Sequence, residues 1–251
     1  MPAADSDKDS YSWRFFHRPY ATWDAMYRDC QDARKSIEFE QYILENDAVG
    51  RRFMELFIEK AKAGLKVFLI CDRFGSSLLY HSPLVKLFRQ HGGKLHFYNP
   101  IHRWTIFMPW RWFPRTHIKT LLIDSSIAYT GGVCMVERMR NWRDTHVRIT
   151  GPVIAQVRQA FNDIEKRILH QKSKGIPDAH NDRRFLYFLN RPSQNRRMVY
   201  RELVKAVNGA KQYIYITSAF FIPNRRFVRL LKRAHARGVD IKVLVPERSD
   251  V

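Results

Sequence analysis

The sequence predicts an α/β fold, a mixed sheet flanked by helices, with one complete lobe and the start of a second. Short apolar runs alternate along the chain with stretches in which apolar residues recur at helical spacing. The segment that follows residue 197 repeats the pattern of the beginning. With 251 residues, 45% of them hydrophobic and 14% aromatic, the chain can bury a sizeable core.

The expected elements follow from local patterns in chain order. Helices are expected where apolar residues lie three and four apart and a glycine follows, as with Phe53, Leu56, Phe57 and then Gly64. Predicted strands span residues 36–44, 66–71, 94–98, 118–123, 127–130 and 145–150, and further predicted helices span 21–34, 83–91 and 152–171. The predicted domains are a lead-in (1–19), a first lobe (20–171), a linker (172–197) and an incomplete second lobe (198–251).

An internal repeat links the two predicted lobes. Phe53, Leu56, Phe57 and Gly64 match Phe227, Leu230, Leu231 and Gly238, each at an offset of 174 positions. The strand before them, with Ala33, Ile37 and Phe39, matches Ala210, Ile214 and Ile216 at an offset of 177, so one loop differs by three residues. Any two strand–helix–strand units share some pattern, but the common glycine and register favour a repeat.

The charge and the cysteine content limit which binding partners and which cellular location are expected. Lys and Arg number 44 against 24 acidic residues, a formal net charge of +20, which favours an anionic membrane surface or nucleic acid, or else a solvated basic surface. Three scattered cysteines predict neither a disulfide framework nor a metal site. A polar start and the lack of a long apolar run predict a cytoplasmic protein with peripheral membrane contact.

The chemical motif is HxKxxxxD, from His117 to Asp124, followed by the pair Gly131-Gly132. Alternate residues of an extended segment point the same way, so His117 and Lys119 are expected to face one phosphate together. A neutral imidazole can attack phosphorus and form a phosphoenzyme, while an ammonium neutralises the developing charge. Glycines let the backbone approach a ligand closely, which makes this pair the candidate substrate-binding residues. Asp124 lies an odd number of positions from His117, so it is expected to face away and to stabilise a turn.

This pattern resembles the HKD motif of the phospholipase D superfamily. The runs WRDTHVRITGP (142–152) and AHARGVDIKVLVP (234–246) look like its cardiolipin synthase branch, and the resemblance extends from about Tyr20 onward. It implies a phospholipase D-like fold, a phosphohistidine intermediate and no cofactor. It also implies that Asp144 hydrogen-bonds the nucleophilic histidine, so the candidate catalytic residues are His117, Lys119, Asp124 and Asp144. Cys134 stands where relatives often carry an asparagine.

The family pattern joins two HKD motifs in one active site. The repeat offset places the second histidine at 291–294, beyond Val251, so the chain is expected to be partial. The missing C-terminal half of the same protein, or a second copy in a homodimer, would supply the second motif. Without it, an inactive membrane-binding chain is one alternative function.

The segment before the motif, residues 101–116, combines aromatic and basic residues and has no acid. Such a mixture suits the headgroup region of an anionic bilayer, and the candidate membrane contacts are Trp104, Trp110, Trp112, Arg111 and Arg115. A packed core loop and contact with single-stranded nucleic acid are the alternatives. The predicted function is phosphatidyl transfer on an anionic phospholipid such as phosphatidylglycerol, with a phospholipase D or a nuclease-type phosphodiesterase as the alternatives.

Overall fold

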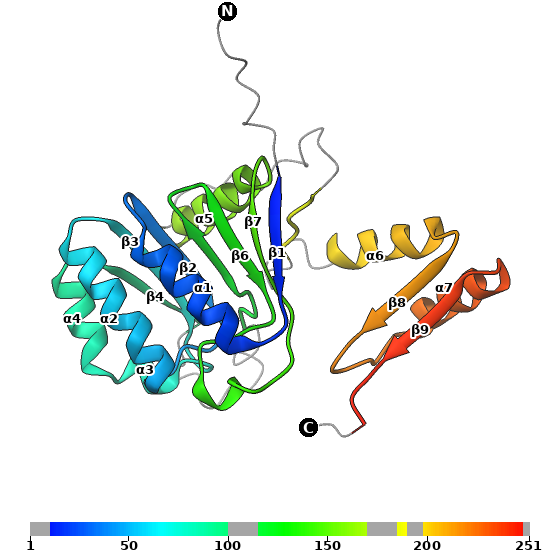
Figure 1. Ribbon diagram of the computed structural model, residues 1–251, viewed down its shortest axis with the longest axis horizontal. Helices are drawn as coiled ribbons and strands as arrows, with labels where there is room; N and C mark the ends of the chain where they lie inside the picture. The colour runs from blue at the N-terminus through cyan, green and yellow to red at the C-terminus, as the bar shows by residue number, and fades with distance from the viewer. Residues whose placement is uncertain (1–10, 100–114, 170–184, 190–197, 248–251) are drawn as a thin grey trace, which may run out of the picture. The chain divides into compact units, whose positions relative to one another are not determined.

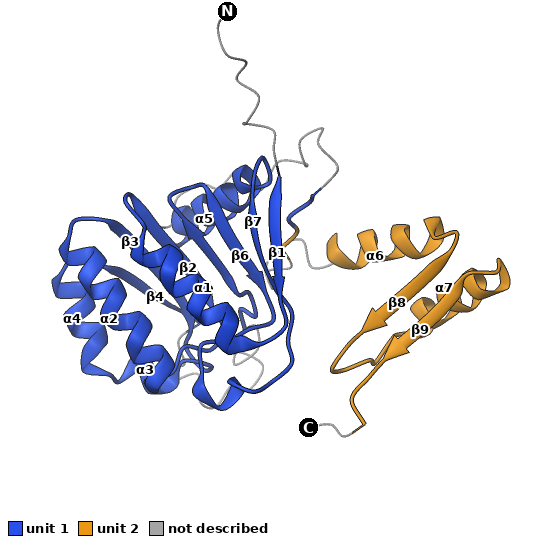
Figure 2. Ribbon diagram, viewed as in Figure 1, with its two compact units in different colours: residues 1–187 blue, residues 188–251 orange. Residues whose placement is uncertain are grey.

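The computed structural model describes residues 11–99, 115–169, 185–189 and 198–247. They belong to two compact units, residues 1–187 and 188–251 (Figure 2). Most of the predicted linker, and residues 101–114 of the aromatic segment, lie outside the described residues.

The first unit contains most of the helices and strands. In chain order they are β1 (Ser12–Phe16), α1 (Pro19–Gln31), β2 (Ser36–Gln41), α2 (Ala48–Lys62), β3 (Lys66–Asp72), α3 (Ser77–Tyr80), α4 (Pro83–Gln90), β4 (Lys94–Tyr98), β5 (Thr120–Ile123), β6 (Ile127–Gly131), a 3-10 turn (Glu137–Met139), β7 (His146–Thr150) and α5 (Ile154–Ile168).

These strands form one seven-stranded mixed sheet in the order β1-β7-β6-β5-β2-β3-β4. Strands β2, β3 and β4 are parallel, and the other neighbours are antiparallel. The predicted hairpin around residues 124–126 is present as β5 and β6. Strand β1 falls in the predicted lead-in and was not predicted, because its partner β7 is distant in sequence and leaves no local signal.

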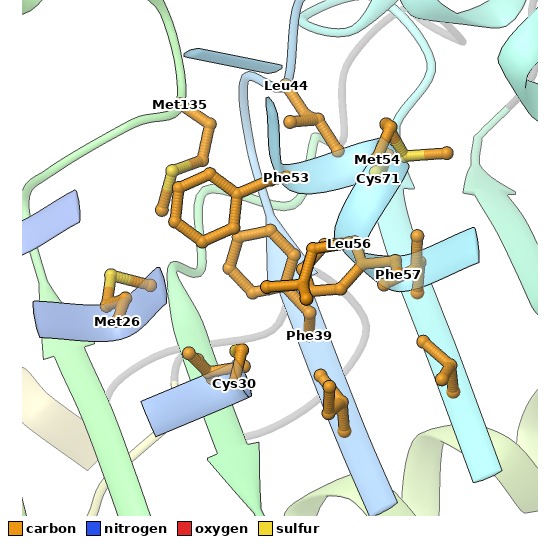
Figure 3. Packing of buried hydrophobic residues seen from close by; sticks show 14 of the residues in the cluster. Met26, Cys30, Phe39, Leu44, Phe53, Met54, Leu56, Phe57, Cys71 and Met135 are labelled. Atoms are coloured by element: carbon orange, nitrogen blue, oxygen red, sulfur yellow. The ribbon is translucent and has the colours of Figure 1, made fainter. Parts of the chain in front are cut away.

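Helices cover both faces of the sheet (Figure 1). Residues of α1, α2 and α4 share one buried cluster with Phe39 of β2 and Leu69 of β3, and Figure 3 shows Phe39, Phe53 and Phe57 together at its centre. Alternate residues of β3, Phe68 and Ile70, face α5 on the other side. Alternate side chains of β3 therefore pack into two separate hydrophobic cores, as expected for an α/β sheet covered on both faces.

The second unit contains α6 (Met198–Gly209), β8 (Tyr213–Thr217), α7 (Arg225–Ala236) and β9 (Asp240–Leu244). Strands β8 and β9 are parallel and pair Ile214 with Ile241, which is the register in which β2 and β3 pair Ile37 with Val67. Gly64 and Gly238, which follow α2 and α7, both have φ 88°. The structure thereby confirms the internal repeat.

Candidate active site

The HKD segment is anchored at the carboxyl ends of two parallel strands. Thr116, which is buried, donates its backbone N–H to Asp72 Oδ2 (3.2 Å) at the end of β3 and its hydroxyl to Glu40 Oε1 (2.7 Å) near the end of β2. Both carboxylates are themselves almost fully buried. His117 and Lys119 follow directly in an extended segment that leads into β5, so these two buried acids fix where the motif begins.

His117 and Lys119 lie side by side, as the strand spacing predicts. Lys119 Nζ is 3.3 Å from His117 Nδ1 and 3.3 Å from Nε2, and it donates to the His117 carbonyl oxygen at 3.1 Å. The imidazole is exposed, whereas the lysine side chain is only 5% exposed. One edge of the histidine is therefore open to an incoming group while the cation is held behind it.

The electrostatics of this pair favour a neutral imidazole beside an ammonium. Desolvation, and then the nearby Lys119 charge, lower the pKa of His117 below its ordinary value. Burial lowers the pKa of Lys119 as well, while the negative charge of Asp144 acts in the opposite direction. At neutral pH the imidazole keeps a lone pair for attack, which is the state that nucleophilic catalysis requires.

The glycine pair brings Asp144 against the motif. A Cβ on Gly132 would lie 2.0 Å from Asp144 Oδ1, and a Cβ on Gly131 would lie 2.3 Å from the Thr145 carbonyl oxygen. A larger residue at position 131 would clash with this backbone, and one at position 132 would require the Asp144 carboxylate to move. The glycines thus permit a close approach, here of protein groups.

The hydrogen bond expected between Asp144 and His117 is not seen among the described residues. Asp144 Oδ1 instead accepts the backbone N–H of Thr145 at 2.7 Å. Burial raises the pKa of the Asp144 carboxyl, and this Thr145 hydrogen bond and the charge of Lys119 oppose that rise. Asp144 is therefore an electrostatic neighbour of Lys119 in this structure and not a direct partner of the imidazole.

His146 also stands beside the site, although the sequence did not single it out. It is 1% exposed, and its Nδ1 accepts the backbone N–H of Val133 at 3.3 Å, directly after the glycine pair. Burial and the Lys119 charge lower the pKa of His146 to about 3, so it is neutral at ordinary pH. Cys134, which follows Val133 in the chain, is also buried. Burial raises the pKa of its thiol, which favours an inert core residue.

Arg115 points inward and not to an exposed membrane face. Its side chain is 13% exposed, its Nη1 is 3.7 Å from Asp72 Oδ1, and the same nitrogen donates to the Asn99 carbonyl oxygen at 3.0 Å. The prediction of a membrane contact at this residue is therefore corrected, because a buried carboxylate holds the guanidinium. The other candidate contacts, Trp104, Trp110, Trp112 and Arg111, lie outside the described residues.

Asp124 lies at the other end of β5, in the turn to β6. Its carboxylate accepts the backbone N–H groups of Arg34, Lys35 and Ser36 at 2.7–2.8 Å and so ties this turn to the start of β2. It takes no part in the cluster around His117, which fits the expected turn-stabilising role and removes Asp124 from the group that contacts substrate. Partial burial on its own would raise the pKa of Asp124, but the three hydrogen bonds outweigh it and lower the pKa.

These contacts give Asp124 a pH-dependent effect on stability. Because its folded-state pKa is below the ordinary 3.8, the stabilisation is fully present above that value and is lost as the pH falls through the lower folded-state pKa. We expect Asp124→Asn to lower the free energy of unfolding by about 1 kcal/mol at pH 7, discounted for partial exposure. Thermal melts should show this difference shrinking below pH 3.8. Glu55→Gln, at an exposed position of α2, is the control, and an Asp124→Asn difference that does not change with pH would contradict the assignment.

Neither a metal cluster nor a membrane-spanning helix is seen in the described part of the chain. No three His, Cys, Asp or Glu side chains there are grouped to hold a metal ion. Within the same residues, no helix has both the length and the apolar character needed to cross a bilayer.

Comparisons with known proteins show which families the chain resembles. A family model described as "Cardiolipin synthase, PLD-like domain" matches residues 203–251. Cardiolipin synthase A of Pseudomonas putida (strain W619) is 30% identical over 240 residues, covering 92% of this chain and 50% of the relative. Cardiolipin synthase A of Pseudomonas aeruginosa (strain LESB58) is 28% identical, covering 92% and 48%.

By these comparisons the chain resembles the phospholipase D superfamily, and in particular its cardiolipin synthases. Among solved structures, phosphatidylserine synthase from Haemophilus influenzae Rd KW20 shares its fold with a TM-score of 0.67 at 11% identity, covering 98% of this chain and 63% of that one. Polyphosphate kinase from Porphyromonas gingivalis has a TM-score of 0.61 at 18% identity, covering 94% and 36%. The chain spans about half the length of the curated relatives it matches.

In the site around His117, Tyr42 is a neighbour that the sequence did not reveal. It lies just beyond β2, its ring centre is 4.6 Å from that of His117, and Lys119 Nζ is 5.3 Å from the same ring. The two rings are tilted by 54° to each other, and the ammonium lies over the tyrosine ring. Because aromatic faces attract cations and exclude water, Tyr42 helps to desolvate both groups.

We expect the Tyr42 ring to set the protonation of His117. In Tyr42→Leu the pKa of His117 should rise toward its ordinary value of 6.5, because the imidazole gains solvent, whereas Tyr42→Phe should keep it low. The measurement is a proton NMR titration of the histidine ring signals, assigned with His117→Ala. Equal pKa values in the Leu and Phe variants would exclude this role.

Proposed function

We propose that the full-length protein is a cardiolipin synthase-like phosphatidyltransferase that works through a phosphohistidine on His117. The observation that carries the proposal is the pairing of an exposed, neutral imidazole with a buried ammonium 3.3 Å away. This arrangement presents a nucleophile and a phosphate-binding cation from one extended segment. The naming of the relatives as cardiolipin synthases supports a phosphatidyl group as the one transferred.

In the first step, a His117 ring nitrogen forms a bond to phosphorus and the phosphodiester bond to the leaving alcohol breaks. Lys119 stabilises the negative charge that builds on the non-bridging oxygens. The leaving alkoxide takes a proton from an acid. In the second step, an acceptor alcohol loses a proton to the resulting base and attacks phosphorus, and the P–N bond breaks to restore His117.

The acid–base group in this scheme is a second histidine. We propose that it comes from a second HKD motif outside these 251 residues, in the same polypeptide or in a second copy of the protein. The internal repeat supports the first source, because β8, α7 and β9 match β2, α2 and β3 in register. The substrate we propose is an anionic phospholipid such as phosphatidylglycerol, at a peripheral membrane location.

The full-length protein should be tested on three substrates. Incubation with phosphatidylglycerol vesicles is expected to yield cardiolipin and free glycerol, and vesicles of phosphatidylcholine alone should yield neither product. Release of phosphatidic acid without cardiolipin would show that water is the acceptor, and the protein would then be a phospholipase D. Cleavage of single-stranded DNA, with the phospholipids unchanged, would reject the proposal in favour of a nuclease.

A further inference from the structure

The second unit carries a strongly basic helix whose charges are not compensated. The described residues of this unit include ten Lys and Arg but only three acids, Glu202, Asp240 and Glu247. Two of these acids pair with lysines outside α7, namely Lys205 and Lys242. In the described part of the chain, no ion pair or hydrogen bond reaches the side chains of the five exposed cations of α7, which are Arg225, Arg226, Arg229, Lys232 and Arg233.

Three of these arginines line one groove. Arg226, Arg229 and Arg233 are spaced three and four apart, so they follow one stripe of the helix. Together with Val204, Asn208 and Leu230 they enclose a groove of about 340 Å³ between α6 and α7. Guanidinium groups bind phosphate oxygens with paired hydrogen bonds, so this basic groove is suited to phosphate groups.

An apolar pocket lies further along the same pair of helices. It measures about 240 Å³, and its lining includes Tyr200 and Leu203 of α6, Phe227 of α7, and Phe220 and Ile222 of the loop before α7. Ile222 is 90% exposed and Phe220 is 55% exposed. Large apolar side chains with this much exposure beside a basic stripe are typical of surfaces that enter the boundary between lipid headgroups and acyl chains.

From the combination of these features we infer that the α6–α7 face docks on an anionic phospholipid surface. The basic groove engages headgroup phosphates, while Ile222 and Phe220 enter the region of the acyl chains. Nucleic acid would also satisfy the arginines, but it would leave Ile222 without an apolar environment. The inference rests on the proposed peripheral membrane location and assigns a surface to it, but it is independent of the chemistry at His117, because binding to vesicles needs no turnover.

The test measures cosedimentation of the full-length protein with phosphatidylcholine vesicles that contain or lack phosphatidylglycerol. Arg226→Gln, Arg229→Gln and Arg233→Gln combined should weaken binding to the anionic vesicles roughly a hundredfold, since each cation near such a surface contributes a factor of about five. The control removes three exposed lysines of the first unit, with Lys62→Gln, Lys86→Gln and Lys166→Gln combined, and should stay within about twofold of wild type.

A second variant keeps the test decisive if the triple arginine variant does not fold. Ile222→Ser should weaken binding roughly tenfold, and this loss should remain at high salt, where the arginine contribution is screened. The inference is overturned if both variants bind the anionic vesicles as wild type does, or if the arginine and lysine variants lose equal affinity. Single-stranded DNA that displaces the protein from vesicles at equal phosphate concentration would assign the face to nucleic acid instead. Because His117→Ala is expected to bind vesicles normally, failure of the catalytic proposal would remain distinguishable.

Discussion

Replacing His117 with alanine is expected to lower kcat for phosphatidyl transfer by a factor on the order of 10⁴ or more, because loss of a nucleophile removes the covalent route altogether. The imidazole is exposed and makes no packing contact deep in the core, so the folded state should persist. The measurement is initial-rate formation of cardiolipin by the full-length protein, with a thermal melt to verify folding. His91→Ala, at the end of α4, is the control and should keep the wild-type rate.

A labelling experiment separates the nucleophile from the acid. Phosphatidylglycerol that carries radioactive phosphorus should leave an acid-labile, base-stable label on the wild-type protein after rapid denaturation, since a P–N bond has that stability. The label should be absent from His117→Ala. A variant that is inactive but still labelled would assign the nucleophile to the other histidine and make His117 the acid–base group.

Replacing Lys119 is expected to produce the second largest loss, on the order of 10³ in kcat for Lys119→Met, because a buried cation at the developing phosphoryl charge is removed. Lys119→Arg keeps the charge and should lose less. Lys86→Met, at an exposed position of α4, should leave kcat unchanged. A Lys119→Met rate close to that of wild type would show that the ammonium does not act on the phosphoryl group.

The pH profile gives an independent check on Lys119. Because burial lowers its pKa below 10.5, the charged form is lost as the pH rises through that lowered value, and kcat of the wild-type protein should fall there. Arginine stays charged, so Lys119→Arg should lack this alkaline limb. On the acid side, the lowered pKa of His117 should keep the wild-type protein active below pH 6.5.

The sequence predicts the fold class and the motif well, because both rest on local patterns. The period of apolar residues reveals β2, α2 and β3 and their copies, and strand alternation brings His117 and Lys119 to the same side. Strand β1 was missed because its stability comes from pairing with β7, which is a non-local contact. Tyr42 and His146 were missed for the same reason, since their roles follow from where the sheet and the glycine pair place them.

The sequence placed Asp144 near the site but assigned the wrong partner. The Thr145 N–H is adjacent in the chain and always within reach, so it competes with any distant donor for the Asp144 carboxylate. Arg115 was assigned to a surface because its neighbours are aromatic and basic, yet the buried Asp72 attracts it inward. A buried acid at the end of a strand leaves only a weak signal in a single sequence. For both Asp144 and Arg115, the prediction named a different interaction partner from the one seen in the folded structure.

The change in repeat offset from 177 to 174 can be located in the structure. Between the two copies the paired strands keep their register, whereas α2 has 15 residues and α7 has 12, so the length difference lies in the first turn of the helix. The segment that joins strand to helix runs from 42 to 47 in the first copy and from 218 to 224 in the second. In the first copy this segment holds Tyr42 against the histidine, and in the second it exposes Phe220 and Ile222. The two copies therefore share strand pairing and helix placement, while their connections present different side chains to the surroundings.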